Sequence, residues 1–463
     1  MLPGVKFVCV TSASMLMSTG CALQSPKPVV PATPGAFANL QAEEQGHWPS
    51  SDWYQGFASQ ELDALIAQAS DANLDLTAAR ARLAQANARA RQAGAALLPS
   101  VDASADGNFL AGHSTNGNAH ETDWSALVSA SYEVDFWGKN RATATAATYL
   151  STAARADRDT VALTTLAGVA DGYFAVLSLT ERLEVARLNR AAAQGLVDAI
   201  EARFVAGLSN PVELASQRAV LANAETSILE LQQQEAEALT ALALLVGQPP
   251  EDFHIHPEPL TALIEPSIGA GLPSELLTRR PDIYVAEANL RAADANLVAA
   301  RAALLPSLSL TAAGGIQNPA MQAAVITLSG TGPTLNLGAG LMQTIFDGGR
   351  LRALRAEAQA KDEELVAAYR GAILAALVDV ENALSAIHHL EAMRDFQNDR
   401  LAQSERAFEG AQLRYRQGSG DFLTLLEAQQ TLYAARDQYS QYRLARLQAR
   451  VSLCKALGGG WHP

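Results

Sequence analysis

Apolar and polar residues alternate along two stretches of the chain. Along most of the remainder, apolar residues recur at helical spacing. The alternation is clearest from Trp124 to Phe136, where apolar positions are separated by mainly Ser, Glu and Asp. A weaker alternation runs from Thr334 to Ile345. Period two predicts β-strands with one apolar and one polar face. Each strand is the second of a predicted β-hairpin, so we expect four strands per chain.

Two interpretations of these strands remain open. They could cover the core of a soluble sandwich, or they could span a membrane with lipid on the apolar side and water on the polar side. Four strands cannot close into a barrel, so a membrane barrel would need strands from several chains.

Very long helices follow the two hairpins. We expect them over about 141–206 and 351–417, and neither stretch contains a proline. Some 65 residues in one helix reach roughly 100 Å, so these helices need partners along their whole length. Shorter helices, Glu61–Leu97 and Ser274–Leu304, precede the hairpins, and each ends at a Leu-Pro pair.

A tight turn and a returning helix follow each long helix. Gly207 can end the first long helix in the left-handed conformation, Asn210 can cap the next helix, and Pro211 suits its first position. Gly418 and Asp421 have the same roles in the second turn. The returning helices carry heptads of a coiled-coil seam. The seam positions are Leu214, Leu221, Ala224, Ile228, Leu231, Ala238, Leu242 and Leu245, then Leu425, Ala428, Leu432, Ala435, Tyr439, Tyr442, Ala449, Leu453 and Ala456. Glu235 and Arg446 interrupt the two seams at the same place, which we interpret as a local solvated gap.

These matching features indicate an internal duplication. Four short motifs recur in order at an offset of about 207 to 211 residues, beginning with Ala96–Ser100 and Ala303–Ser307. We assign a first repeat to 51–250, a connector to 251–272 and a second repeat to 273–461.

The N-terminus differs from the rest. Residues 1–20 read as a signal peptide, with Lys6 as the only charge before an apolar run. Gly20-Cys21 is typical of a lipoprotein cleavage site, so Cys21 is predicted to be acylated; ordinary signal cleavage nearby is the alternative. Residues 21–50 hold five prolines and form an extended linker or strap.

Composition narrows the function. The net charge of -14 argues against nucleic acid as a partner, because phosphates would not be neutralised. No run reaches the roughly 18 consecutive apolar residues of a membrane-spanning helix. If the chain spans a membrane, it must do so as a closed β-barrel.

Three segments carry a resemblance to a known family. They are Leu277–Ile283, which contains Arg-Arg-Pro-Asp, then Arg414–Gln429, and finally Ala456–Trp461. Together they resemble the TolC-type outer membrane factors, and more closely the OprM-like lipoproteins of resistance-nodulation-division (RND) pumps. The resemblance implies a mainly α fold with a transmembrane β part. Three chains would form a 12-stranded β-barrel in the outer membrane and an α-barrel in the periplasm.

The resemblance also implies a gate and partners. Leu423 and Glu427 match the apolar and acidic rings that line the closed periplasmic aperture of OprM-like ducts. From the residues alone, Leu423 is more typical of helix core and Glu427 of a solvated surface acid. Gly207, Asn210, Pro211, Gly418 and Asp421 would form the docking surface for a periplasmic adaptor (membrane fusion protein), or serve only as turn residues. The implied partners are two further copies of the chain, this adaptor, an inner-membrane RND-type pump and outer-membrane lipid.

No catalytic site is predicted, so we expect a passive duct for small molecules or drugs rather than an enzyme, with no cofactor. His254 and His256 lie in the connector close to acidic residues, but two histidines in a loop are more typical of surface polarity than of a metal site. The alternative functions are an outer membrane duct for type I protein secretion and a purely structural periplasmic coiled coil.

Overall fold

A computed structural model describes residues 34–39, 48–114, 117–317 and 332–462 of the chain. Cys21 and the predicted signal peptide lie outside these residues. The described part forms two units. The sheet unit contains Leu83–Ala154 and Val285–Arg370, and the coil unit contains Pro31–Arg82, Arg155–Tyr284 and Gly371–Pro463.

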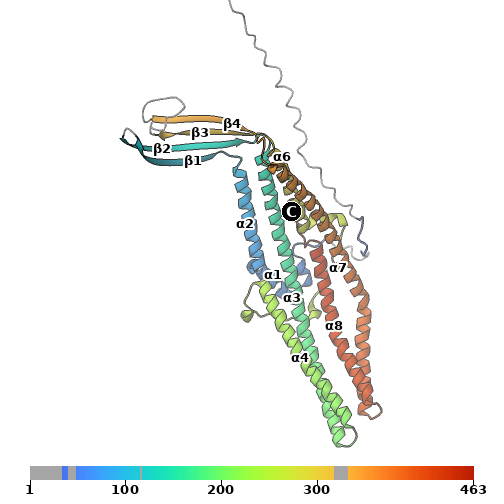
Figure 1. Ribbon diagram of the computed structural model, residues 1–463. Helices are drawn as coiled ribbons and strands as arrows, with labels where there is room; N and C mark the ends of the chain where they lie inside the picture. The colour runs from blue at the N-terminus through green and yellow to red at the C-terminus, as the bar shows by residue number, and fades with distance from the viewer. Residues whose placement is uncertain (1–33, 40–47, 115–116, 318–331, 463) are drawn as a thin grey trace, which may run out of the picture. The chain divides into compact units, whose positions relative to one another are not determined.

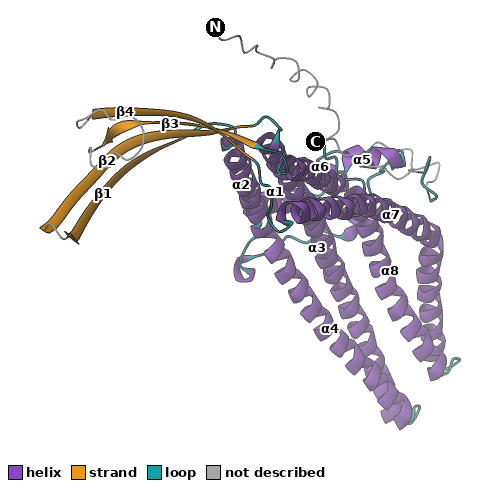
Figure 2. Cartoon of the chain, turned by 45° about the horizontal axis from the view of Figure 1, so that its top comes forward, coloured by secondary structure: helices purple, strands orange, loops and turns teal. Residues whose placement is uncertain are grey.

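The sheet unit holds one four-stranded antiparallel sheet. Its strands are β1 (Ser100–Ser114), β2 (Gly117–Val134), β3 (Ser307–Gln317) and β4 (Gly332–Met342), adjacent in that order (Figure 2). The register aligns apolar positions across the sheet: Val128 pairs with Ala103 on one side and Gly314 on the other. The alternation in each strand therefore builds one continuous apolar face.

This apolar face is exposed in the single chain. Val128 is 55% exposed, Leu335 74% and Leu337 77%. A sandwich strand would bury these side chains, so the structure disfavours a soluble sandwich. The sheet also has two open edges, β1 and β4. Their unpaired backbone groups require partners in a membrane.

Two helices of 67 residues each confirm the predicted long helices. They are α3 (Lys139–Val205) and α7 (Arg350–Arg416), and both run through the two units. The returning helices are α4 (Pro211–Val246) and α8 (Phe422–Ala456). In the coil unit, α3 with α4 and α7 with α8 form two helical hairpins (Figure 1).

By length and composition alone, α3 and α7 each contain a segment apolar enough to cross a membrane. This differs from the sequence expectation, which considered only uninterrupted apolar runs. In α3, Tyr173, Phe174 and Leu177 are almost wholly buried in the coil unit, so core packing accounts for part of this apolar character.

The prediction of one helix before each β-hairpin is wrong in one respect, because the structure divides each into two helices. The first divides into α1 (Gln60–Ala72) and α2 (Leu74–Ala95), with Asn73 extended between them. The second divides into α5 (Leu276–Arg279) and α6 (Pro281–Ala302), with Arg280 extended because a proline follows. Short 3₁₀ helices complete the chain at Trp53–Phe57, Pro250–Asp252, Leu260–Ala262 and Pro273–Glu275.

The two break residues have equivalent partners. Asn73 caps α2 and its Nδ2 donates to the carbonyl of Leu245 at 2.8 Å. Arg280 Nη1 donates to the carbonyl of Ala456 at 2.9 Å. Leu245 and Ala456 are themselves equivalent in the duplication. Each break therefore fastens its repeat to the end of its own returning helix.

The predicted seams are largely confirmed. Leu231, Leu242, Leu432, Ala435 and Leu453 are all buried.

The prediction of a solvated gap at the two seam interruptions is wrong. Glu235 accepts a hydrogen bond from Thr180 Oγ1 at 2.7 Å. Arg446 forms a 2.8 Å ion pair with Glu265. Both interruptions are thus polar contacts to a neighbouring segment of the coil unit.

Candidate functional site: the two helical hairpin tips

The first tip joins α3 to α4. Gly207 has a φ of +74°, and the amide of Leu208 donates to the carbonyl of Arg203 at 2.8 Å. This bond satisfies a carbonyl at the end of α3. Asn210 then caps α4 by accepting from the amide of Glu213 at 3.0 Å, with Pro211 at the first helical position. The predicted turn chemistry is confirmed.

The second tip, between α7 and α8, repeats this geometry. Gly418 has a φ of +73°, and the amide of Ser419 donates to the carbonyl of Arg414 at 2.9 Å. Asp421 accepts from the amide of Thr424 at 2.8 Å and from its hydroxyl at 2.8 Å. These hydrogen bonds lower the pKa of the Asp421 carboxyl from its ordinary value.

The two tips contact each other through a tyrosine. Tyr415, in the last turn of α7, donates its hydroxyl to Glu213 Oε2 at 3.0 Å. Arg203 lies over the Tyr415 ring, 4.9 Å from its centroid, and donates to the Tyr415 carbonyl at 3.3 Å. Burial, and then the hydrogen bond to Glu213, raise the pKa of Tyr415. The phenol therefore stays a donor, and the hairpins are joined at their tips.

Leu423 and Glu427 lie one turn apart on α8, just after the second tip. Leu423 is 61% exposed, and Glu427 is exposed as well. Within the described part of the chain, Leu423 is thus not a core residue. The equivalent positions on α4 are Val212, which is 71% exposed, and Ser216, which is half-buried. Only the second tip presents a carboxylate next to an exposed apolar side chain at these positions.

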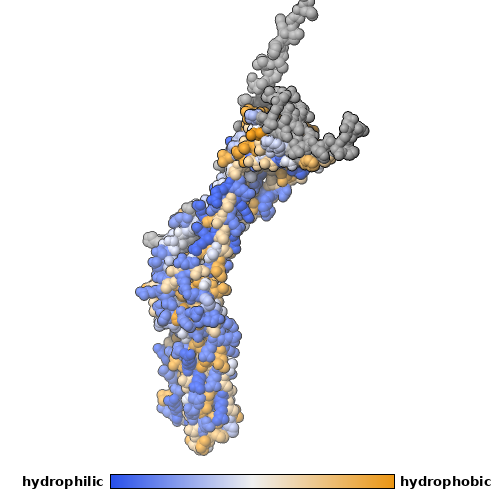
Figure 3. Space-filling view, turned by 90° about the vertical axis from the view of Figure 1, so that its left-hand side faces the viewer, coloured by the Kyte–Doolittle hydropathy of each residue, from blue (hydrophilic) through white to orange (hydrophobic). Residues whose placement is uncertain are grey.

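Other apolar side chains also reach the surface at the tips. Val205 is 82% exposed and Leu208 is 68% exposed. Figure 3 shows apolar surface at this end of the coil unit. Exposed apolar residues at the end of a helical hairpin are typical of a contact surface for another chain.

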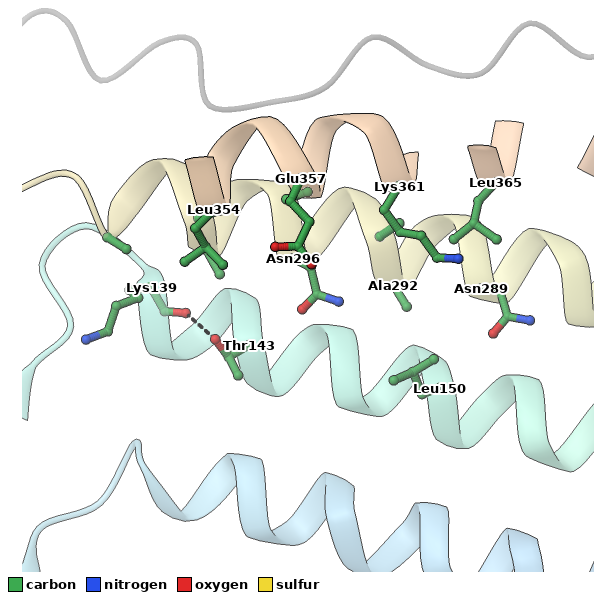
Figure 4. Close-up of a pocket in the computed structure, with 15 residues that line it drawn as sticks. Lys139, Thr143, Leu150, Asn289, Ala292, Asn296, Leu354, Glu357, Lys361 and Leu365 are labelled. Atoms are coloured by element: carbon green, nitrogen blue, oxygen red, sulfur yellow. Dashed lines mark hydrogen bonds between the residues drawn. The ribbon is translucent and has the colours of Figure 1, made fainter. Parts of the chain in front are cut away.

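A groove of about 700 Å³ lies within the sheet unit. Helices α3, α6 and α7 line it, and its lining includes alanines of α6 and the polar residues Asn289, Asn296 and Lys361 (Figure 4). Its lining residues contain no paired nucleophile and base, so they give no indication of a catalytic site.

The histidines of the connector are not gathered into a metal site. The amide of His256 donates to Glu61 Oε1 at 3.2 Å, and its side chain is 94% exposed. Among the described residues, no group of three or more His, Cys, Asp or Glu side chains could hold a metal ion.

Sequence reasoning missed the contacts between the hairpins. Phe204 and Tyr415 are equivalent in the duplication, so the pattern shows an aromatic residue at both positions. The hydroxyl present only at Tyr415 was the available signal. Its partner Glu213 could not be identified, because the two residues are 202 positions apart.

Comparison with known proteins supports an export channel. The family model for outer membrane efflux proteins matches residues 65–248 and 272–459. The pyoverdine export outer membrane protein OpmQ of Pseudomonas aeruginosa is 41% identical over 99% of this chain and 97% of its own length.

Solved channels share the fold. The outer-membrane channel OprN has a TM-score of 0.87 at 27% identity, and the match covers 96% of this chain and 100% of OprN. The open-state MtrE channel of Neisseria gonorrhoeae has a TM-score of 0.83 at 29% identity, with 94% and 97% covered. Such channels are trimeric outer-membrane components of tripartite pumps and are not enzymes. The chain belongs to the outer membrane efflux protein family, and it is a TolC-like efflux channel of the outer membrane.

Proposed function

We propose that three copies of the chain form one gated duct, with Leu423 and Glu427 of each copy lining its periplasmic aperture. Three four-stranded sheets would join through β1 and β4 into a barrel of twelve strands. This closure would pair the edge strands and place the exposed apolar face against lipid. The two efflux repeats would occupy 51–250 and 273–461, joined by the connector 251–272.

The exposure of Leu423 beside Glu427 carries the aperture assignment. A leucine that is 61% exposed close to a helical tip has no core role in the single chain. Threefold symmetry would bring three such leucines and three carboxylates into two successive rings. The apolar ring would oppose the passage of water and ions, and the acidic ring would favour cations near the opening.

The aperture is tested by replacing both side chains. We expect Leu423→Ala with Glu427→Ala to raise the single-channel conductance of purified trimers in planar bilayers, because two constrictions become wider. The matched control is Val212→Ala with Ser216→Ala at the equivalent positions of the first tip. An unchanged conductance in the first variant, or an equal rise in the control, would contradict the assignment.

The partners follow from the same geometry. We assign the tip residues Gly207, Asn210, Pro211, Gly418 and Asp421 to the docking of a periplasmic adaptor. The apolar side chains exposed around them support this role. The adaptor would connect the duct to an inner-membrane RND-type pump, which supplies the energy, and an acyl group on Cys21 would anchor the chain to outer-membrane lipid.

The cargo is proposed from the similarity to OpmQ, whose name assigns it to pyoverdine export. A secreted small molecule of this kind would pass through the duct. Expression of this chain in Pseudomonas aeruginosa lacking OpmQ is expected to restore pyoverdine in the culture medium. The negative control is Leu337→Arg, which places a charge on the exposed apolar face of β4 and should prevent insertion into the outer membrane. If the chain reaches the outer membrane and the medium stays free of pyoverdine, this cargo assignment fails.

A further inference from the structure

Two glutamines in the coil unit are wholly buried among apolar side chains. Gln217 of α4 and Gln429 of α8 are both 0% exposed. Helical spacing of three or four residues places them on the same faces as Leu214, Leu425 and Leu432, which belong to a cluster of buried apolar residues. Its members are Leu196, Val197, Ile200, Leu214, Phe408, Tyr415, Leu425 and Leu432. An uncharged amide in such a core loses water contacts, so it must find protein partners there.

The partners form a continuous chain of hydrogen bonds. Gln217 Nε2 donates to Gln429 Oε1 at 3.2 Å, and Gln429 Nε2 donates to the Tyr433 hydroxyl at 2.8 Å. The Tyr433 hydroxyl donates to the carbonyl of Asn189 in α3 at 2.7 Å. We name Gln217, Gln429, Tyr433 and Asn189 the glutamine layer. It joins α3, α4 and α8, and therefore links the first helical hairpin to the second.

The layer extends to the fourth helix through an arginine. Arg436 of α8 donates to Asn189 Oδ1 at 3.3 Å and to Glu405 of α7 at 3.3 Å. All four long helices of the coil unit are thus connected by one network, which extends roughly 10 Å along α8 from Gln429 to Arg436. Gln429, the member nearest the second tip on α8, lies eight residues beyond the Asp421 cap, or roughly 12 Å along the helix.

The layer has a strong preference for one rotation of α8 about its axis. Both polar ends of the Gln429 side chain are used, one by Gln217 and one by Tyr433. If α8 rotated, these groups would be left buried without partners or would enter apolar surroundings. Leucines, by contrast, can repack in several rotations with little change in contact.

This rotation decides where the aperture residues lie. Successive helical residues are about 100° apart, so Glu427 lies about 160° from Gln429 around the axis, and Leu423 about 120°. Burial of Gln429 therefore directs Leu423 and Glu427 away from the core, as their exposure shows.

We propose that the glutamine layer is the positioning element of the aperture: it fixes the rotation of α8 and so holds Leu423 and Glu427 in the resting constriction. This inference rests on the proposed function of those two residues. A single buried polar contact that selects one register at a cost in stability has the same physical basis in coiled coils.

The layer also contains an unsatisfied atom. Gln217 Oε1 is buried and has no hydrogen-bond partner in the described structure. An all-apolar replacement removes that unsatisfied acceptor. A purely stabilising role is thus distinguishable from a positioning role, because the replacement should loosen α8 without lowering stability.

The test uses full-length trimers that carry Gln217→Leu together with Gln429→Leu. A thiol introduced by Ala435→Cys reports on α8, since Ala435 is buried at 2% exposure. The native Cys454, also buried in α8, is the internal reference. Labelling rates at both sites, the thermal midpoint and single-channel conductance are measured together. Gln430→Leu, at the exposed neighbouring position, is the matched control.

We expect the double variant to label several-fold faster at position 435, with Cys454 and the thermal midpoint unchanged and with higher conductance. Unchanged labelling at position 435 overturns the proposal. Faster labelling of Cys454 together with a lower midpoint also overturns it, because the layer would then be merely structural. Faster labelling at position 435 with unchanged conductance supports the control of α8 rotation and overturns the aperture assignment instead.

Discussion

Arginine at position 337 is expected to remove most trimers from the outer membrane. Leu337 is the central residue of β4 and is 77% exposed on the apolar face of the sheet. An arginine on the lipid side near the bilayer midplane costs about 2–4 kcal/mol. Three copies in one trimer raise this to roughly 6–12 kcal/mol, which is comparable to the whole stability of an ordinary domain.

The neighbouring position provides the control for this prediction. Asn336 alternates with Leu337 and lies on the polar face, opposite Ala313 of β3. In a water-filled barrel, Asn336→Arg should leave insertion close to normal. The measurement is the amount of trimer in isolated outer membranes, judged by migration before and after heating. Equal loss in both variants, or in neither, would show that the apolar face does not contact lipid.

The faces of the sheet were predictable because they depend on a local rule. Alternation places successive side chains on opposite sides whatever the strand pairs with. The register then had only to align the apolar positions, as it does between Val128 and Gly314. The hairpin tips were predictable for the same reason, since Gly207 and Asn210 act on atoms within a few residues of themselves.

The break at Asn73 was not predictable, because a distant partner stabilises it. The break at Arg280 has a local signal, the proline at the next position, which the prediction of a single helix did not take into account. Nothing beside Asn73 in the sequence indicates that its amide binds the carbonyl of Leu245, 172 positions away. The local sequence is compatible with one helix from Glu61 onward. The hydrogen bond of Asn73 to a distant carbonyl instead stabilises an extended residue between two helices. Gln217 was missed for a similar reason, since its hydrogen-bond partner Gln429 is 212 residues away.

The break at Arg280 gives the second large expected effect. Replacing Arg280 by alanine should destabilise the protein by about 1.5–3 kcal/mol. The buried guanidinium loses its hydrogen bonds to charged groups, while the carboxylates of Asp282 and Asp379 are 37% and 53% exposed and remain in contact with water. The side chain is 7% exposed. It donates to Asp282 at 3.0 and 2.6 Å, to Asp379 of α7 at 3.0 Å and to the carbonyl of Ala456 at 2.9 Å.

The loss would not be confined to one contact. The guanidinium holds the start of α6, the middle of α7 and the end of α8 together, and the truncation leaves the Ala456 carbonyl without this donor. Thermal unfolding of purified trimers measures the effect. Arg280→Lys keeps the charge but not the planar fork, so we expect an intermediate loss.

The adjacent residue Arg279 provides a control, because its ion pair is partly exposed rather than buried. Arg279 lies over the Trp48 ring at 4.7 Å and pairs with Glu275 at 3.6 Å, with its side chain 30% exposed. Partly exposed pairs of this kind contribute about 0–1 kcal/mol, so Arg279→Ala should shift the unfolding midpoint only slightly. In the first repeat, Asn73→Ala removes the equivalent hydrogen bond but no charge, and its effect should lie between the two. If Arg280→Ala were no worse than Arg279→Ala, the second repeat would not depend on the break residue for its attachment to α8.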